Sequence, residues 1–239
     1  MKILCIIGSM GAPGGAQRVL SYLVRHFSDR HQVILLTFEN PSAGSFYPMP
    51  EGVKRVCLDR LGGNGFERLS KLFSRPKLIR KEVLHRKPDV IISFMDTTNV
   101  TTLLSCIGLR VPVIISERID PSMHRIGCLK EMARSIAYPL AKIIVVPTKR
   151  VANYFPMRLQ PKILVIPNPV PLPSLTARPG ITSIEDCNRI VAVGRLEPQK
   201  GFDRLIEAFA LVAGERPDWN LVVIGEGSER PKKIGRAHV

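Results

Sequence analysis

Short apolar runs alternate along this chain with longer segments in which the apolar residues recur every three or four positions. The runs, rich in Ile and Val, predict β-strands, and the longer period predicts amphipathic helices. Several runs are apolar at consecutive positions, which is typical of parallel strands covered by helices on both faces. Strands are therefore predicted at residues 2–7, 32–38, 53–58, 89–94, 111–116, 142–146 and 162–166.

The segment between the first two predicted strands has the clearest helical period. Its apolar residues share one face of a helix predicted over residues 16–27, and they are Val19, Leu20, Leu23, Val24 and Phe27. Repeated alternation of strand and helix predicts the fold class, a doubly wound, Rossmann-like α/β domain over residues 1–166.

The pattern changes at residue 167. The run Pro167-Asn168-Pro169-Val170-Pro171-Leu172-Pro173 cannot donate a continuous ladder of hydrogen bonds, so it predicts an extended linker over residues 167–187. A strand at 189–193, a helix at 201–214 and a strand at 220–224 then predict the start of a second Rossmann-like domain over 188–233. A complete domain needs about 100 to 150 residues, so we expect this one to be truncated. The last six residues, 234–239, resemble a translated sequencing adapter and are expected to be an artefact without function.

Composition and charge narrow the class of protein. Hydrophobic residues make up 45% of the chain, enough for a sizeable core. No apolar run approaches the roughly 20 residues of a membrane span, and no signal peptide is present, which predicts a cytoplasmic location. The net charge of +15 favours an anionic membrane face or phosphorylated substrates as partners. Four Tyr and one Trp, not clustered among basic residues, argue against nucleic acid.

The five cysteines lie far apart and form no CxxC pair. They predict reduced thiols in the core, with neither a metal site nor a disulfide framework.

Two loops that join a strand to a helix are candidates for chemistry, and the first is rich in glycine. The first, at residues 8–15, joins the first strand to the first helix, where backbone N–H groups can approach an anion. Its glycines do not match the dinucleotide fingerprint GxGxxG or a P-loop. The second, at residues 194–201, places Arg195 and Lys200 between a strand end and a helix N-terminus, which suits a diphosphate.

The run Val193-Gly194-Arg195-Leu196, with Lys200-Gly201-Phe202-Asp203 after it, resembles the donor-side signature of GT-B glycosyltransferases of family four. The resemblance extends over residues 1 to 230. It implies that Arg195 and Lys200 hold the diphosphate of a nucleotide-sugar donor, so that no metal or other cofactor is needed. It further implies that backbone amides of Gly14 and Gly15 face donor or acceptor. The nucleoside is expected beside Gly194, Gly225, Glu226 and Gly227.

The run Ser116-Glu117-Arg118-Ile119-Asp120-Pro121 is similar to the branch that moves N-acetylhexosamine onto polyprenyl-diphosphate-linked glycans. The resemblance implies a retaining transferase with a UDP-linked donor, acting in cell-surface glycan assembly. Many members carry histidine where this chain has Glu117, which leaves two roles open for this candidate catalytic residue, general base or acceptor positioning. The family's paired-glutamate segment is expected beyond residue 230, so we expect the chain as given to be inactive.

A basic amphipathic segment covers residues 66–87. Arg68, Lys71 and Arg75 are spaced to align on one helical face, with Phe66, Leu69 and Phe73 on another. Such a helix suits anionic lipid or a lipid diphosphate and predicts a peripheral protein at the inner face of the cytoplasmic membrane. An ordinary solvated face is the alternative.

Two other functions remain open. In an NAD(P)-dependent oxidoreductase, Glu39 at the end of the second strand would bind ribose hydroxyls, although the glycine spacing does not fit. A non-catalytic basic module for nucleic acid would need a groove-reading motif, which the sequence lacks. Binding of a sugar nucleotide, a nicotinamide cofactor or an oligonucleotide separates the three.

Overall fold

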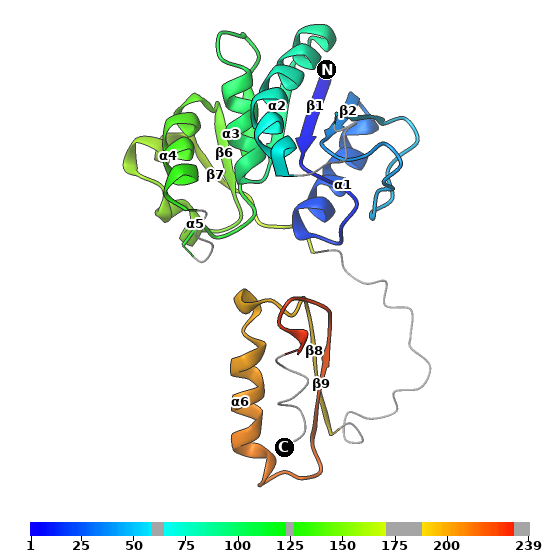
Figure 1. Cartoon of the computed structure of the whole chain (residues 1–239), viewed down its shortest axis with the longest axis vertical. Helices are drawn as coiled ribbons and strands as arrows, with labels where there is room; N and C mark the ends of the chain where they lie inside the picture. The colour runs from blue at the N-terminus through cyan, green and yellow to red at the C-terminus, as the bar shows by residue number, and fades with distance from the viewer. Residues whose placement is uncertain (59–64, 123–126, 171–187, 232–239) are drawn as a thin grey trace. The chain divides into compact units, whose positions relative to one another are not determined.

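The computed structural model describes residues 1–58, 65–122, 127–170 and 188–231, and the side chains of residues 65–73 and 199 lie outside this description. The chain forms two compact units, Met1–Val170 and Pro171–Val239 (Figure 1). The boundary between them falls inside the predicted linker. The suspected artefact at residues 234–239 lies outside the described residues.

Unit 1 is built on one parallel sheet whose seven strands all coincide with predicted ones. The strand order is β3-β2-β1-β4-β5-β6-β7, so the order reverses between β1 and β4. In such sheets ligands bind beyond the carboxyl ends of the strands at this switch point. The strands are β1 Lys2–Ile7, β2 Gln32–Thr37, β3 Lys54–Cys57, β4 Val90–Phe94, β5 Val113–Ser116, β6 Ile143–Val146 and β7 Ile163–Val165.

Helices cover both faces of this sheet, as the consecutive apolar runs predict. Residues of β1 alternate between two core clusters, Leu4 and Ile6 in one and Cys5 and Ile7 in the other. Both faces of β1 are therefore buried. The helices are α1 Gly15–Ser28, α2 Gly65–Arg86, α3 Asp96–Ser105, α4 Cys128–Ala137 and α5 Lys149–Tyr154, with 3₁₀ turns η1 Tyr138–Leu140 and η2 Met157–Lys162.

Two details of unit 1 bear on the expectations from sequence. Helix α2 continues through Pro76, although proline removes a backbone hydrogen bond there. Cys5 and Cys106 are buried, as predicted for core thiols, but Cys128 at the start of α4 is exposed, so the prediction is wrong for this cysteine.

The described residues of unit 2 form a parallel pair of strands, a 3₁₀ turn and an α-helix. These are β8 Arg189–Val193, the 3₁₀ turn η3 Pro198–Lys200, α6 Phe202–Ala213 and β9 Asn220–Ile224. The predicted strands and helix are confirmed. Among the described residues of this unit, only Leu196 and Phe202 are buried hydrophobics. None of the helices in the described part of the chain has the length and hydrophobicity needed to span a bilayer.

Candidate functional site

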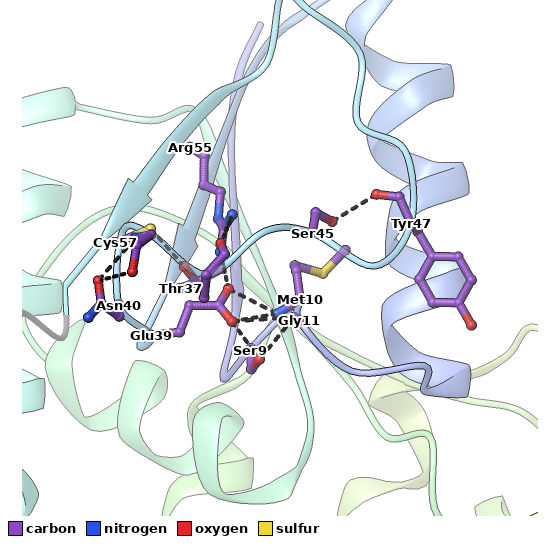
Figure 2. A network of polar contacts seen from close by, with 12 residues as sticks. Ser9, Met10, Gly11, Thr37, Glu39, Asn40, Ser45, Tyr47, Arg55 and Cys57 are labelled. Atoms are coloured by element: carbon purple, nitrogen blue, oxygen red, sulfur yellow. Dashed lines mark hydrogen bonds and ion pairs between the residues drawn. The ribbon is translucent and has the colours of Figure 1, made fainter. Parts of the chain in front are cut away.

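The loop after β1 encloses a carboxylate of the chain itself (Figure 2). Ser9 donates its hydroxyl proton to Glu39 Oε2 at 2.6 Å, and the backbone N–H of Met10 donates to Oε1 at 3.0 Å. The Gly11 N–H donates to Oε2 at 3.3 Å, and Arg55 Nη2 lies 2.5 Å from Oε1. Glu39 thus fixes the start of the glycine-rich loop and joins it to β3.

The charge of Glu39 is stabilised by these partners. Burial alone would raise the pKa of Glu39, but the hydrogen bonds from Ser9 and Met10 and the Arg55 guanidinium lower it below its ordinary value. The amides of Met10 and Gly11 therefore already bind an anion, and Glu39 has no free oxygen facing a ribose. This geometry removes the basis of the oxidoreductase interpretation.

The second half of the same loop leads into α1. The Gln17 side chain lies against Gly14, since a Cβ on Gly14 would lie 2.1 Å from Gln17 Oε1. Gly14 is the N-cap of α1, and no side chain caps this helix. An atom at the Cβ position of Gly15 would meet no other atom within 4 Å. The expected contact of Gly14 and Gly15 with donor or acceptor stays a prediction, with an uncapped helix N-terminus at the right place for it.

The backbone is strained on the other side of the switch point. Met95, which follows β4, has φ +77° and ψ 142°, a backbone conformation that residues other than glycine rarely adopt. Its N–H donates to the Ser116 carbonyl at 3.2 Å, and the side-chain amide of buried Asn99 donates to the same oxygen at 3.2 Å. Nothing in the sequence marks Met95, because the expected residue at such a position is glycine.

Glu117 directly follows β5 and is 2% exposed. Its Oε1 accepts a hydrogen bond from the hydroxyl of Tyr138, and its N–H donates to the Val145 carbonyl at 2.9 Å. Burial raises the pKa of Glu117 to about 8, against the opposing effect of the Arg134 cation. The carboxyl is therefore predominantly protonated at neutral pH, and it lies beneath the surface of unit 1.

Arg118, for which the sequence analysis predicts no role, adds a cation beside Glu117. Its Nη1 donates to Asn168 Oδ1 at 2.8 Å, and its guanidinium lies 5.5 Å from the centroid of the Phe94 ring. Burial lowers the pKa of Arg118. The end of β5 is thus tied to the segment that begins the predicted linker.

In unit 2 the segment 194–196 after β8 lies against the segment 225–227 after β9. The Gly194 N–H donates to the Ile224 carbonyl at 3.0 Å, and the Leu196 N–H donates to the Glu226 carbonyl at 2.9 Å. A Cβ on Gly225 would lie 1.8 Å from the Gly194 oxygen, and one on Gly227 would lie 2.3 Å from the Leu196 oxygen. Glycine is therefore required at both positions by the close approach of the two segments.

The cations of the second loop are exposed to solvent. Within the described residues neither Arg195 nor Lys200 has an ion-pair partner. Lys200 ends η3, and Gly201, with φ +67°, turns the chain into α6, which has no side-chain cap. The diphosphate site expected here stays a prediction, with two exposed cations beside an uncapped helix N-terminus at the right place for it. Glu226, by contrast, points to solvent and pairs with Arg230 at 3.5 Å.

The structure describes the side chain of Arg75 but not those of Arg68 and Lys71, the other two members of the predicted basic face. Arg68 and Lys71 lie in the first half of α2, and their side chains fall outside the described residues. The Arg75 guanidinium packs 4.8 Å from the centroid of the Phe38 ring and is half-buried. No group of three His, Cys, Asp or Glu residues within the described part of the chain could hold a metal ion.

The fold of the chain is GT-B. Anabaena Alr3699/HepE, solved with UDP and glucose, matches 99% of this chain and 64% of its own with a TM-score of 0.67 and 19% identity. The lipopolysaccharide outer core galactosyltransferase WaaB matches 99% of this chain and 64% of its own, with a TM-score of 0.65 and 15% identity. A UDP-GlcNAc 2-epimerase from Neisseria meningitidis also shares the fold, at a TM-score of 0.56 and 12% identity. Fold alone therefore does not separate transferase from epimerase.

The family models that match the sequence are those of glycosyltransferases, not of epimerases. Residues 13–173 match the model of Glycosyltransferase Family 4, and residues 176–238 match that of Glycosyl transferases group 1. The chain belongs to Glycosyltransferase Family 4, which confirms the resemblance seen in the sequence.

Two curated relatives have transferase names. A Campylobacter jejuni protein, a GalNAc-alpha-(1->4)-GalNAc-alpha-(1->3)-diNAcBac-PP-undecaprenol alpha-1,4-N-acetyl-D-galactosaminyltransferase, is 27% identical over 96% of this chain and 63% of its own length. The amylovoran biosynthesis glycosyltransferase AmsD of Erwinia amylovora is 28% identical over 100% of this chain and 66% of its own. The chain thus spans slightly less than two thirds of the length of these relatives.

Proposed function

We propose that the protein to which this chain belongs transfers N-acetylhexosamine from a UDP-linked donor to a polyprenyl-diphosphate-linked glycan. The transfer retains the configuration of the sugar, takes place at the inner face of the cytoplasmic membrane, and serves bacterial cell-surface polysaccharide assembly. Arg195 and Lys200 hold the donor diphosphate, and no metal or other cofactor takes part.

The observation that carries this proposal is the pair of exposed cations in unit 2. Arg195 and Lys200 flank a turn that leads into an uncapped helix. A diphosphate leaving group develops negative charge as the sugar departs, and fixed cations beside it stabilise that charge in the way a metal ion would. The neighbouring Gly225 and Gly227 allow the segment after β9 to pack closely against Gly194 and Leu196, which places this segment beside the loop that carries the cations.

The acceptor class is supported from outside the donor site. The C. jejuni relative is named for an undecaprenol diphosphate glycan, and the E. amylovora relative is named for a polysaccharide pathway. The net charge of +15 favours an acceptor that carries diphosphate and a membrane that carries anionic lipid.

The burial of Glu117 argues against both roles left open for it, general base and positioning of the acceptor. A general base must be ionised and within reach of the proton it takes. Glu117 has a pKa of about 8, is 2% exposed, and is bonded to Tyr138. We therefore assign it to holding the end of β5 and, with it, the cation Arg118 that follows.

The test is transfer of radiolabelled sugar from UDP-GlcNAc and UDP-GalNAc to a polyprenyl-diphosphate oligosaccharide by the full-length protein. We expect label in the lipid fraction, undiminished by EDTA, and an α-linked product from the α-linked donor. Hydrolysis or epimerisation of the donor without transfer would overturn the proposal, as would strict dependence on a divalent cation.

A further inference from the structure

Helix α4 has its apolar side facing solvent. Leu129, Met132 and Ile136, spaced i, i+3 and i+7, form one stripe and are 79%, 56% and 62% exposed. The buried side of the helix carries Arg134 and Ala137. Most amphipathic helices in globular proteins bury the apolar stripe, so this one is inverted with respect to the core of unit 1.

The inversion is fixed by the partners of Arg134. This guanidinium is 4% exposed and pairs with Glu131 at 2.5 Å. It also donates to the Tyr154 hydroxyl at 3.0 Å and lies 5.8 Å from the centroid of the Phe155 ring. Turning the helix to bury its apolar stripe would expose the rings and break these contacts. The outward stripe is therefore a stable feature of unit 1.

The stripe continues onto neighbouring segments. Arg158 in η2 donates to the Ser135 carbonyl at 3.3 Å, which places η2 beside α4. Met157, which starts η2, is 84% exposed, and Leu140 at the end of η1 is 50% exposed. In Figure 1, α4 lies at the margin of unit 1, on the side of β6 and β7 away from α1. The α4 face is defined here as Leu129, Met132, Ile136, Leu140 and Met157.

The surroundings of the α4 face are strongly basic. Residues 128–162 contain a single acidic side chain, Glu131, which is engaged by Arg134. Four cations of this segment are exposed and pair with no carboxylate of the described residues, and they are Lys130, Lys142, Lys149 and Arg158. The seven basic residues of the segment are Lys130, Arg134, Lys142, Lys149, Arg150, Arg158 and Lys162.

We propose that the α4 face inserts into an anionic membrane and that the surrounding cations bind its lipid headgroups. An exposed apolar stripe among Lys and Arg is the arrangement by which interfacial helices bind bilayers. A second copy of the chain fits less well, because a symmetric dimer would place this basic surface against itself. The inference rests on the proposed function, which requires a membrane-borne acceptor.

Sedimentation with vesicles tests the proposal directly. The wild-type chain and a Leu129→Ser/Met132→Ser/Ile136→Ser variant are compared on vesicles of phosphatidylcholine with 30 mol% phosphatidylglycerol and on phosphatidylcholine alone. We expect the wild type to bind the anionic vesicles, more weakly as salt is raised. The affinity of the triple variant for the anionic vesicles should be at least about tenfold lower than that of the wild type. The matched control is Leu84→Ser/Ile107→Ser, which removes exposed apolar residues elsewhere in unit 1 and should bind as the wild type does.

Two further measurements keep the outcomes separate. Circular dichroism and analytical ultracentrifugation show whether the triple variant folds and whether it has lost a dimer. Undiminished vesicle binding by the folded triple variant would overturn the proposal, as would a loss of self-association in place of vesicle binding. Retained binding together with failure of Arg68→Glu/Lys71→Glu/Arg75→Glu would assign membrane contact to α2 instead.

Transfer assays distinguish this inference from the proposed function. With a short water-soluble diphosphate acceptor, the full-length triple variant should match the wild type, whereas transfer to an acceptor embedded in vesicles should fall about tenfold. Absence of transfer to both acceptors by the wild type would reject the proposed function and leave the vesicle result standing.

Discussion

The two candidate loops of this chain each follow a β-strand and lead into a helix, and the structure gives them different electrostatics. The loop of unit 1 is closed on an internal anion, since the amides of Met10 and Gly11 bind the Glu39 carboxylate. The loop of unit 2 exposes Arg195 and Lys200, which have no partner among the described residues. Glycine content alone therefore does not identify an anion site. What matters is whether the chain supplies the anion itself.

The same contrast extends to the other charges at the two sites. In unit 1, Glu117 is buried against Tyr138 and Arg118 against Phe94. In unit 2, Arg195 and Lys200 are exposed to water, where a ligand can reach them. Unit 1 thus offers a rigid scaffold, and unit 2 offers unsatisfied charge, which is the arrangement expected if the donor diphosphate binds to unit 2.

The largest expected effect comes from removing the exposed cations. Arg195→Ala and Lys200→Ala in the full-length protein should each lower kcat/KM by an amount equivalent to about 2 to 4 kcal/mol, because each removes a charged contact to the departing diphosphate. Steady-state kinetics with varied UDP-sugar measure this. Arg189→Ala, which removes an exposed cation at the other end of β8, is the control and should leave kcat/KM unchanged. Near-normal kinetics for both loop variants would remove the contrast between the loops.

The contact between the two glycine segments of unit 2 gives the next effect. Gly225→Ala would place a Cβ 1.8 Å from the Gly194 oxygen and should destabilise unit 2 by about 1 to 3 kcal/mol. The matched control is Gly214→Ala at the end of α6, where nothing lies within 4 Å. Hydrogen exchange of the β8 and β9 amides reports on this unit separately. Equal exchange in the two variants would contradict the geometry.

The buried carboxyl of Glu117 predicts an unusual pH dependence. A raised pKa means that the folded state holds a proton that the unfolded state has released, so stability falls as pH rises toward about 8. Glu117→Gln keeps the acceptor for Tyr138 and should flatten this slope, by up to about 1.4 kcal/mol per pH unit. Urea unfolding of wild type and variant between pH 5 and 8 measures it. Parallel curves would show that Glu117 titrates normally.

The smallest effect is expected at Glu39, where the sign is reversed. The lowered pKa means that its contribution to stability is present at neutral pH and is lost as pH falls through the folded-state pKa. Glu39→Gln should cost about 1 kcal/mol at pH 7 and should lose less on acidification than the wild type. Chemical unfolding of unit 1, followed at pH 7 and in acid, provides the test. A variant as stable as the wild type at pH 7 would mean that the loop does not depend on its internal anion.

The strands could be predicted from the sequence because a run of apolar residues reports burial locally. The family resemblance places Gly225 and Gly227 on the nucleoside side of the site. The structure adds that these glycines allow close contact with Gly194 and Leu196, which the sequence alone could not show. Long-range contacts of this kind have no local signature.

The hydrogen-bond partners of Glu39 and the orientation of α4 could not be predicted for the same reason. The position of Glu39 at a strand end suggests a ribose ligand, whereas Ser9 and Arg55, which bind its carboxylate, lie far from it along the chain. Helical periodicity shows that α4 is amphipathic but not which side faces the core. That choice depends on Tyr154 and Phe155, which hold Arg134 inside.

The central claim is that unit 2 binds the donor diphosphate through Arg195 and Lys200. Isothermal titration of the chain with UDP, NAD⁺ and a single-stranded oligonucleotide, alongside the Arg195→Ala/Lys200→Ala variant, tests it most directly. We predict binding of UDP to the wild type, at least tenfold weaker binding to the variant, and no saturable binding of NAD⁺ or the oligonucleotide. Equal affinity of wild type and variant for UDP, or a preference for NAD⁺, would contradict it.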